Sequence, residues 1–80
     1  MSSLVSVIIT TKNESAVIKR LLTSLRDQSY KNIEIILIDN NSSDATTKIA
    51  KKFTKKIFNF GPERSAQRNF GAKIAKGSLL

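Results

Sequence analysis

The sequence has 80 residues, enough for one small domain and too few for a second. It contains no cysteine and no histidine, which excludes a disulfide scaffold, a thiolate zinc site, a cysteine nucleophile and a histidine general base. Its 14 Lys and Arg residues against 6 Asp and Glu give a net charge of +8. Such a charge attracts anions of any kind, including nucleotide phosphates, nucleic acid and acidic membrane surfaces.

The start of the chain, Met1-Ser2-Ser3-Leu4, lacks the basic stretch of a secretory signal peptide. No apolar run approaches the roughly 20 residues that a membrane-spanning helix needs. We therefore expect a cytoplasmic protein, with the cytoplasmic face of a membrane as the place of a longer form.

Two buried strands frame the first predicted helix. Residues 4–10 and 33–38 are rich in Val, Ile and Leu with little polar interruption, as in strands covered on both faces. Between them, apolar residues recur at helical spacing from Val17 to Leu25. We predict Asn13 as the N-cap of this helix, Glu14 in its first turn and its end near Gln28.

Residues 39–44 are turn and cap formers that introduce a second predicted helix. Its inner face takes Ala45, Ile49, Ala50 and Phe53. Its other sides and its end are coated with lysines: Lys48, Lys51, Lys52, Lys55 and Lys56. A short strand at residues 57–60 and a break at residues 61–62 follow.

A third predicted helix spans residues 63–76, with Ala66, Phe70 and Ile74 inward and Gly77 as the residue that ends it. Residues 78–80 begin a fourth strand. This alternation predicts an α/β fold, a Rossmann-like three-layer half-sheet of the form βαβαβα(β), mainly parallel. Residues 1–80 then form a single, incomplete domain, and ligands of such sheets bind at the carboxyl ends of the strands.

The residues after the first strand, Thr10 to Glu14, match neither Gly-x-Gly-x-x-Gly nor Gly-x-x-x-x-Gly-Lys-Ser/Thr, the two glycine-rich phosphate-binding patterns. Their hydroxyl, amide and carboxylate groups suit hydrogen bonds to a base or a ribose. The same residue types are what any strand-to-helix loop prefers, so capping and loop filling remain the alternative.

Asp39 and Asn40 leave the sheet after the second strand. A carboxylate at this place accepts hydrogen bonds from a base or from ribose hydroxyls in related sheets. Formation of an Asx turn is the alternative role. We interpret Ser42, Ser43 and Asp44 as caps of the next helix.

Arg64 and Arg68 lie four residues apart on the first turns of the third predicted helix and so share a face. Cations there oppose the helix macrodipole by about 0.3–1 kcal/mol each, so a structural role explains them poorly. A phosphate or nucleotide bound nearby explains them better.

The lysines of the second predicted helix are interpreted first as a solvated face. The alternative function for the chain is a small basic module that binds nucleic acid or an anionic membrane surface. The phenylalanines fit apolar positions instead of alternating with the lysines, and no nucleic-acid module pattern is present. Nucleic acid is therefore not the expected partner.

Four sequence blocks are spread over nearly the whole chain: residues 5–14 (VSVIITTKNE), 25–30 (LRDQSY), 34–46 (EIILIDNNSSDAT) and 66–71 (AQRNFG), the last followed by 75–77 (AKG). In this order they resemble the N-terminal part of a family 2 glycosyltransferase with the GT-A fold. They are similar to that family's Pro-Thr-Tyr-Asn-Glu loop, its Leu-x-x-Gln-Ser/Thr-Tyr segment, its Val-Asp-Asp/Asn-Gly-Ser-x-Asp-x-Thr block and its Ala-Arg-Asn-x-Gly helix.

The resemblance implies the nucleotide-sugar-binding half of an inverting glycosyltransferase, with a UDP- or GDP-linked sugar as donor and an unknown acceptor. It assigns nucleotide binding to polar residues that follow the strands: Thr10, Thr11, Lys12, Glu14, Asp39, Asn40, Arg64 and Arg68.

Within that set, the resemblance implies that Thr10, Thr11 and Glu14 line the base and ribose pocket. It implies that Asp39 or Asn40 contacts the base edge, and that one of the two arginines lies near the base or the diphosphate.

The sequence departs from the family at two of these positions. Lys12 stands where the family has an aromatic residue, which implies that stacking on the base is lost or becomes a cation–π contact. Asn40 stands where many members have a second acid, which leaves the base selectivity open.

The family's Asp-x-Asp metal motif follows the fourth strand, beyond Leu80, and its general base and acceptor site lie further on. The resemblance therefore implies Mg²⁺ or Mn²⁺ in the complete enzyme, no metal site or catalytic residue in these 80 residues, and no transfer by them alone. We expect a truncated product or a domain that binds without turnover. Self-association through the open edge of the first strand is a further expectation.

Overall fold

The computed structural model of the protein describes residues 3–79. Its elements follow in the order β1 (Val5–Thr11), α1 (Ser15–Asp27), β2 (Ile33–Asp39), α2 (Thr46–Ala50), β3 (Ile57–Asn59), α3 (Arg64–Ile74) and β4 (Ser78–Leu79). This order confirms the predicted alternation of strands and helices. The described residues do not include Met1 and Ser2, which belong to the segment expected to lack a signal peptide. They also do not include Leu80, the last residue of the predicted fourth strand.

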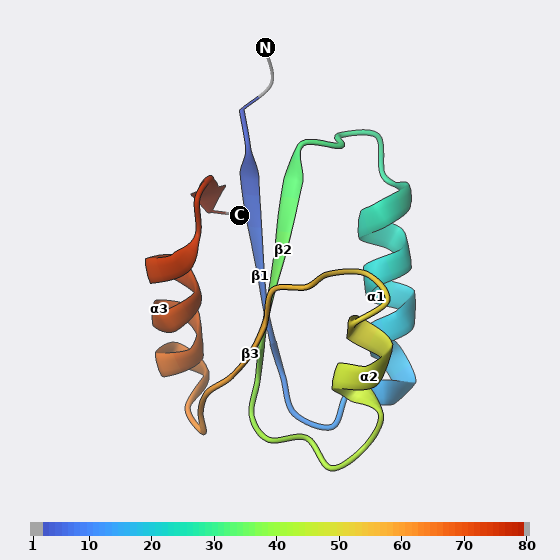
Figure 1. Ribbon diagram of the computed structural model, residues 1–80, viewed down its shortest axis with the longest axis vertical. Helices are drawn as coiled ribbons and strands as arrows, with labels where there is room; N and C mark the ends of the chain where they lie inside the picture. The colour runs from blue at the N-terminus through green and yellow to red at the C-terminus, as the bar shows by residue number, and fades with distance from the viewer. Residues whose placement is uncertain (1–2, 80) are drawn as a thin grey trace.

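The strands form one parallel sheet in the order β3-β2-β1-β4. β1 and β2 pair from Val5 opposite Ile33 to Thr11 opposite Asp39, so both strands end at the same edge. α1 and α2 cover one face of the sheet and α3 covers the other (Figure 1). The loops after β1, β2 and β3 therefore gather at the carboxyl edge of the sheet, at the bottom of Figure 1.

The core lies between β2 and the two helices on its face. One cluster of residues, each at most 1% exposed, joins α1, β2 and α2: Ile18, Leu22, Leu37 and Ala50. Ile36 and Ile38, which alternate with Leu37 along the strand, are fully buried on the face toward α3. β2 is therefore covered on both faces, which confirms the prediction from its uninterrupted apolar run.

The fourth strand pairs with only the beginning of β1, through Val5 with Ser78 and Ser6 with Leu79. The expectation that β1 lacks a neighbour on this side is thus wrong for its first residues. From Val7 to Thr11 the strand has no partner on that side within residues 3–79.

The predicted start of the first helix is wrong. The N-cap of α1 is Glu14, and Asn13 precedes it with a left-handed φ of 51°. The side chain of Asn13 is directed across the fold instead, where its Oδ1 accepts the Ser43 N–H at 2.8 Å. Asn13 therefore bonds to a residue that is distant in the sequence and does not cap the adjacent helix.

The second helix is shorter than predicted. α2 ends at Ala50, because the chain turns after it and Thr54 Oγ1 donates to the Ile35 carbonyl at 2.7 Å, which directs the chain toward β3. Ile49 and Phe53 pack against the core as expected. Ala45 is exposed, so its predicted inward position is wrong.

The third helix ends at Ile74, with Ala75 extended, so Gly77 is not its terminating residue. Gly77 is required for a different reason, since a Cβ there would lie 2.4 Å from the Leu4 carbonyl oxygen. The most buried residues of α3 are Gln67 and Gly71, which lie beside the predicted inner residues Ala66, Phe70 and Ile74, all three half-buried. Gln67 Nε2 donates to the Ile38 carbonyl at 3.0 Å, which fastens the helix to β2.

Glu34 joins four segments at the amino edge of the sheet. Its Oε2 accepts the hydroxyl of Ser6 at 2.5 Å and the N–H of Lys76 at 2.6 Å, and its Oε1 pairs with the Lys56 ammonium. The Gly77 N–H donates in turn to Ser6 Oγ at 2.9 Å. The bonds from Lys56, Ser6 and Lys76 outweigh burial and lower the pKa of Glu34 to about 2.

Within residues 3–79, no helix combines the length and the apolar composition needed to cross a bilayer.

We predict that Glu34 makes the fold sensitive to acid. Its folded pKa of about 2 lies below the usual 4.5, so its contribution is complete above pH 4.5 and is lost as the pH falls toward 2. Glu34→Gln should lower the free energy of unfolding at pH 7 by about 1–3 kcal/mol, because buried donors lose a charged acceptor. The measurement is urea unfolding of both proteins between pH 7 and pH 2.

The matched control is Glu63→Gln, which makes the same chemical change at a glutamate that is exposed. Glu63→Gln should keep the acid dependence of the parent chain, whereas Glu34→Gln should flatten it between pH 4.5 and 2. Identical acid profiles for the parent and Glu34→Gln would contradict the assignment.

Candidate functional site

Two loops meet at the carboxyl edge of the sheet, one after β1 (residues 12–14) and one after β2 (residues 40–45). We call the network of hydrogen bonds that joins residues 11–15 to residues 39–46 the loop lock. At its base, Thr11 Oγ1 donates to Asp39 Oδ1 at 2.6 Å, and the Asn40 N–H donates to the Thr11 carbonyl at 2.8 Å. The strand pairing thus continues into the loops.

The Asp39 carboxylate is the centre of the loop lock. It is 3% exposed and also accepts the Ser42 N–H at 2.7 Å and the Ser42 hydroxyl at 2.6 Å. A buried carboxylate is stable where such donors replace water. Asp39 thus accepts from the residue three positions on, one further than in the Asx turn given as its alternative role, and it shapes the loop after β2 through Ser42.

Further bonds connect the tips of the two loops. The Asn13 N–H donates to Ser42 Oγ at 2.8 Å, next to the bond between Ser43 and Asn13. The ammonium of Lys12 donates to the Asn41 carbonyl at 3.1 Å. The loop after β1 is therefore held by the loop after β2.

The second loop and the first residue of α2 also cap the first helix. Asp44 Oδ2 accepts the Ser15 N–H at 3.1 Å, and Thr46 Oγ1 accepts the Glu14 N–H at 2.8 Å. Asp44 Oδ1 accepts the N–H of Thr46 at 3.0 Å and also its hydroxyl, but the N-cap of α2 is Ala45, so the prediction of Ser42, Ser43 or Asp44 as this cap is wrong by at least one residue. The Thr46 hydroxyl, followed by the bonds with Ser15, holds the pKa of Asp44 below its usual range.

Two asparagines give the loops their shape. Asn13 and Asn41 have φ values of 51° and 45°, in the left-handed region that asparagine tolerates better than most residues. Asn41 stands at the glycine of the resembled Asp-Asp/Asn-Gly-Ser block, so its backbone angle explains why a glycine suits this place. The Asn41 N–H is held by Asn59 Oδ1 at 2.8 Å.

The structure brings six of the predicted site residues to this edge: Thr10, Thr11, Lys12, Glu14, Asp39 and Asn40. Thr11 and Asp39 are buried, Lys12 is exposed, and the others are half-buried. Asn40 lies against Gly61, where a Cβ would come within 2.7 Å of the asparagine side chain. Their binding role stays a prediction.

The two arginines occupy different surroundings. Arg64 is exposed and begins α3 at the carboxyl edge. Arg68 is one turn further on, where it lines a separate hollow together with Ile8 and Leu79. Arg68 is thus placed beside the junction of β1 and β4 and apart from the loop lock.

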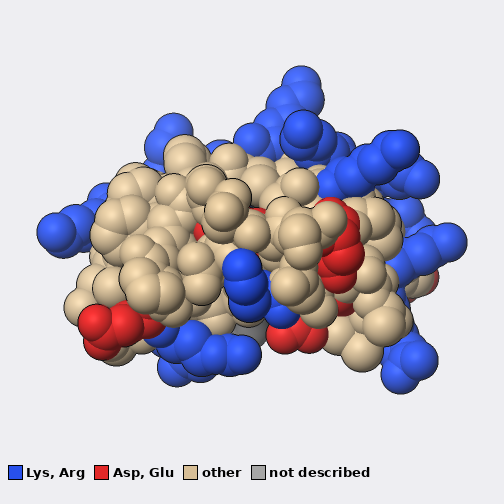
Figure 2. Space-filling view, turned by 90° about the horizontal axis from the view of Figure 1, so that it is seen from below, with Lys and Arg blue, Asp and Glu red and all other residues tan. Residues whose placement is uncertain are grey.

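A hollow of about 280 Å³ opens beside the loop lock, between β2, β3 and α2. Asp39, Ser42, Asn59 and Lys51 are among its lining residues. Seen from this end, Lys and Arg side chains project around the rim of the molecule, acidic groups show in separate places, and most of the face between them is uncharged (Figure 2). Residues 3–79 contain no group of three or more His, Cys, Asp or Glu side chains that could hold a metal ion.

Sequence reasoning missed Thr46 and Gln67 as organising residues. Both are almost completely buried polar side chains on helices whose inner faces were taken to be apolar. Two signals were available for Thr46: the resembled block ends in Asp-x-Thr at this residue, and Thr46 lies two residues after Asp44, the spacing of an Asx turn. No local pattern marks the bond from Gln67 to β2.

The chain matches Glycosyl transferase family 2 over residues 6–80. It belongs to this family. It is 38% identical over 82 aligned positions to an uncharacterized glycosyltransferase of Rickettsia typhi, covering 99% of this chain and 26% of that protein. It is also 38% identical over 82 positions to the Escherichia coli UDP-Glc:alpha-D-GlcNAc-diphosphoundecaprenol beta-1,3-glucosyltransferase WfaP, covering 96% of this chain and 33% of WfaP.

The fold of this family 2 chain is that of a known transferase. It matches the mannosyltransferase PcManGT from Pyrobaculum calidifontis, solved in complex with GDP-Man and Mn²⁺, with a TM-score of 0.83 and 22% identity over 96% of this chain and 26% of that one. This likeness confirms the predicted GT-A, Rossmann-like fold. The chain spans a quarter to a third of the length of these three proteins.

We predict that the left-handed backbone at Asn41 limits which residues are tolerated there. Asn41→Val should lower the free energy of unfolding by about 1–2 kcal/mol, because a β-branched residue is strained in this region. Asn41→Gly should leave stability unchanged within about 0.5 kcal/mol, since glycine adopts the same φ freely. Urea unfolding of the three proteins at pH 7 measures both effects.

Asn41→Ala serves as the intermediate case, with a short side chain and a smaller steric penalty. The expected order of stability is Gly, then Ala, then Val. An equal loss for Gly and Val would mean that the asparagine side chain, and not the backbone angle, is what the loop requires.

Proposed function

We propose that this chain forms the nucleotide-sugar donor site of an inverting glycosyltransferase. The observation that carries the proposal is the loop lock, which places polar residues of β1 and β2 at the carboxyl edge of a sheet in a chain that belongs to family 2. WfaP is named for a UDP-linked glucose, and PcManGT was solved with GDP-Man. Both names support a nucleoside-diphosphate sugar as the donor.

The geometry supports a division of labour at this edge. Three intramolecular donors already occupy the Asp39 carboxylate, which suits it to hold the loop in shape. Asn40 and Glu14 are half-buried at the same edge and are the better candidates to contact a base or a ribose. Arg64 is exposed at the start of α3, at the same edge, and is our candidate for the cation that binds the diphosphate.

In the complete enzyme, an acceptor hydroxyl attacks the anomeric carbon of the sugar. The bond to the nucleoside diphosphate breaks, the diphosphate leaves with the electron pair, and a carboxylate takes the hydroxyl proton. Mn²⁺ in the PcManGT complex supports a divalent metal in the full-length protein. The residues described here do not fit one, since they hold no cluster of metal ligands, so we assign neither the metal nor the base to them.

It follows that the 80 residues should bind a nucleotide without transferring a sugar. We further propose a cytoplasmic site of action, where nucleotide sugars are the donors, and self-association through the unpaired part of β1 as a separate property.

We predict weak, local nucleotide binding by the chain as it stands. Titration of the ¹⁵N-labelled protein with UDP and with GDP should shift amide signals of residues 10–14, 39–40 and 64–68, with a dissociation constant of roughly 1 mM. Mg²⁺ should change these shifts little, because no described cluster binds it. A missing response at millimolar concentrations of both nucleotides would overturn the proposal.

A pair of variants on α3 tests the role of the arginine. Arg64→Gln should weaken nucleotide binding about fivefold, or about 1 kcal/mol, through loss of one contact with the phosphates. Lys73→Gln removes the same charge from an exposed place near the other end of α3 and should change binding by less than twofold. Equal effects of the two variants would show that only net charge attracts the nucleotide.

The alternative function, a basic module for polyanions, rests on the net charge of +8. It predicts binding to a nucleic-acid duplex or to anionic vesicles that falls steeply between about 50 and 200 mM salt and that UDP does not displace. Local nucleotide shifts that persist at 200 mM salt favour the donor site instead.

A further inference from the structure

The lysines of α2 lie on the side of the helix that faces away from the core. Backbone hydrogen bonds from the N–H groups of Lys51 and Thr54, at 3.0 and 3.1 Å, continue the helical turn beyond Ala50. Ala50 and Ile49 pack into the core on the inner side of this turn. The outer side carries exposed lysines spaced three and four residues apart: Lys48, Lys51, Lys52 and Lys55.

These four lysines have no anionic partner within residues 3–79. Residues 45–56 contain five lysines and no Asp or Glu. The fifth, Lys56, pairs with Glu34, whereas the other four ammonium groups make neither an ion pair nor a hydrogen bond with a described residue. Like charges three and four residues apart on a helix repel one another, so the fold gains no stability from this arrangement. An anionic partner outside the chain would offset the repulsion.

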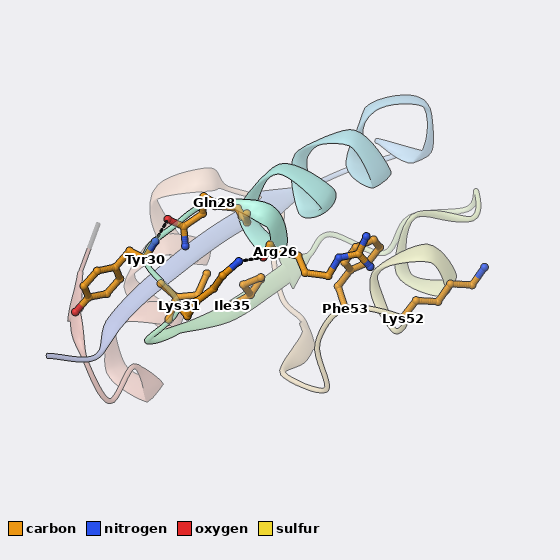
Figure 3. A pocket seen from close by; sticks show the side chains of 9 residues that line it. Arg26, Gln28, Tyr30, Lys31, Ile35, Lys52 and Phe53 are labelled. Carbon is orange, nitrogen blue, oxygen red and sulfur yellow. Dashed lines mark hydrogen bonds between the residues drawn. The ribbon is translucent and has the colours of Figure 1, made fainter. Parts of the chain in front are cut away.

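α1 extends this cationic surface, because it lies beside α2 on the same face of the sheet (Figure 1). The Arg26 guanidinium of α1 lies 5.0 Å from the centroid of the Phe53 ring, which follows α2, and so connects the two helices. Figure 3 shows this contact beside a hollow of about 260 Å³, with the Lys52 side chain extending away from it.

α1 adds two further exposed cations, which likewise have no ion pair with a described residue: Lys19 and Arg20. We call the cations of the two helices the cationic helix face: Lys19, Arg20, Arg26, Lys48, Lys51, Lys52 and Lys55. Asp27 on α1 is the carboxylate 3.4 Å from Arg26, and it leaves the face strongly positive.

Two aliphatic side chains are exposed among the cations of α1. Val17 is 47% exposed and Leu21 44%, one helical turn apart and next to Lys19 and Arg20 in the sequence. The core takes Ile18 and Leu22 from this helix and leaves Val17 and Leu21 on its flank. Cations together with exposed aliphatic groups are typical of helices that lie on an anionic bilayer, with charges at the headgroups and aliphatic groups at the acyl boundary.

We propose that the cationic helix face docks the chain on an anionic lipid bilayer, through its lysines and through Val17 and Leu21. The composition of the face favours lipid over nucleic acid. α1 and residues 46–56 contain one aromatic residue, Phe53, which is half-buried and lies beside Arg26, so the face offers no exposed ring on which a base could stack. The proposal does not depend on the donor site at the carboxyl edge, and the two surfaces would serve the same chain together.

Co-sedimentation with vesicles tests the choice of partner. The vesicles are phosphatidylcholine alone and phosphatidylcholine with about 30% phosphatidylglycerol, at about 150 mM salt. A DNA duplex of about 20 base pairs, at the same phosphate concentration, is the second polyanion. The chain should bind the anionic vesicles at least about tenfold more tightly than either of the other two. No binding to anionic vesicles, or equal or tighter binding to phosphatidylcholine or to the duplex, would overturn the proposal.

A pair of double variants tests the place of the charges. Lys48→Gln combined with Lys52→Gln should weaken vesicle binding at least about tenfold. Lys73→Gln combined with Lys76→Gln removes two exposed cations at the end of α3, on the other face of the sheet, and should weaken binding less than about threefold. Because both double variants lower the net charge equally, equal losses would show that net charge alone attracts the chain and would overturn the proposal.

A second pair tests the apolar contact without a change in charge. Leu21→Gln should weaken binding to anionic vesicles about fivefold, because the flank of α1 loses its aliphatic group. Leu79→Gln changes a leucine that is 56% exposed on β4 and should leave binding within about twofold. Full affinity of Leu21→Gln would overturn the proposal, since the charges would then act alone. Retained dispersion of the backbone amide signals shows that each variant is folded.

Spin-labelled lipid in phosphatidylglycerol-containing bicelles tests the orientation directly. The label should attenuate the amide signals of residues 17–21 and 48–55 more strongly than those of residues 66–74 on α3. A saturating amount of UDP should leave this pattern unchanged, whatever the state of the donor site. Equal attenuation on both faces of the sheet, or stronger attenuation of α3, would overturn the proposal.

Discussion

A carboxylate that is 3% exposed must replace its hydration shell with donors from the protein, and Asp39 does so with the Thr11 hydroxyl and two groups of Ser42. These donors come from two segments that are 28 and 3 residues away in the sequence. The carboxylate therefore joins β1, β2 and the loop after β2 in one place. The rest of the loop lock depends on this junction, because Ser42 is also the acceptor for the Asn13 N–H.

β2 carries a second organising carboxylate at its other end. Glu34 and Asp39 are an odd number of residues apart and so project from opposite faces of the strand. Glu34 fastens β1 and the connection between α3 and β4 at the amino edge, whereas Asp39 shapes the loops at the carboxyl edge. One strand thus positions elements on both of its faces, and its inner place in the sheet, between β1 and β3, makes it the most buried of the strands.

The fold was predictable because periodic apolar runs mark its strands and helices. The errors concern the ends of the helices, as at Ala45 and Gly77, and polar residues with distant partners. Asn13 has the composition of a local N-cap, yet its side chain bonds to Ser43, and α1 is capped instead by Asp44 and Thr46. Local preference favours a cap at Asn13 by about 1 kcal/mol, and several bonds between the loops together outweigh it. A single sequence records the residue types that can cap, but it does not record which loop will lie beside them.

Lys12 illustrates what the structure adds to a resemblance. The family has an aromatic residue at its place, and the sequence alone left either lost stacking or a cation–π contact with the base. The Lys12 ammonium is bonded to the Asn41 carbonyl, at the point where the left-handed φ of Asn41 turns that carbonyl toward the first loop. The cation thereby helps to close the loop lock and keeps its charge at an exposed place on the carboxyl edge. A charge held there attracts phosphate by Coulomb interaction and offers no flat surface to a base. In the donor site that we propose, we therefore expect selectivity among bases to come from hydrogen bonds made by neighbours such as Asn40 and Glu14.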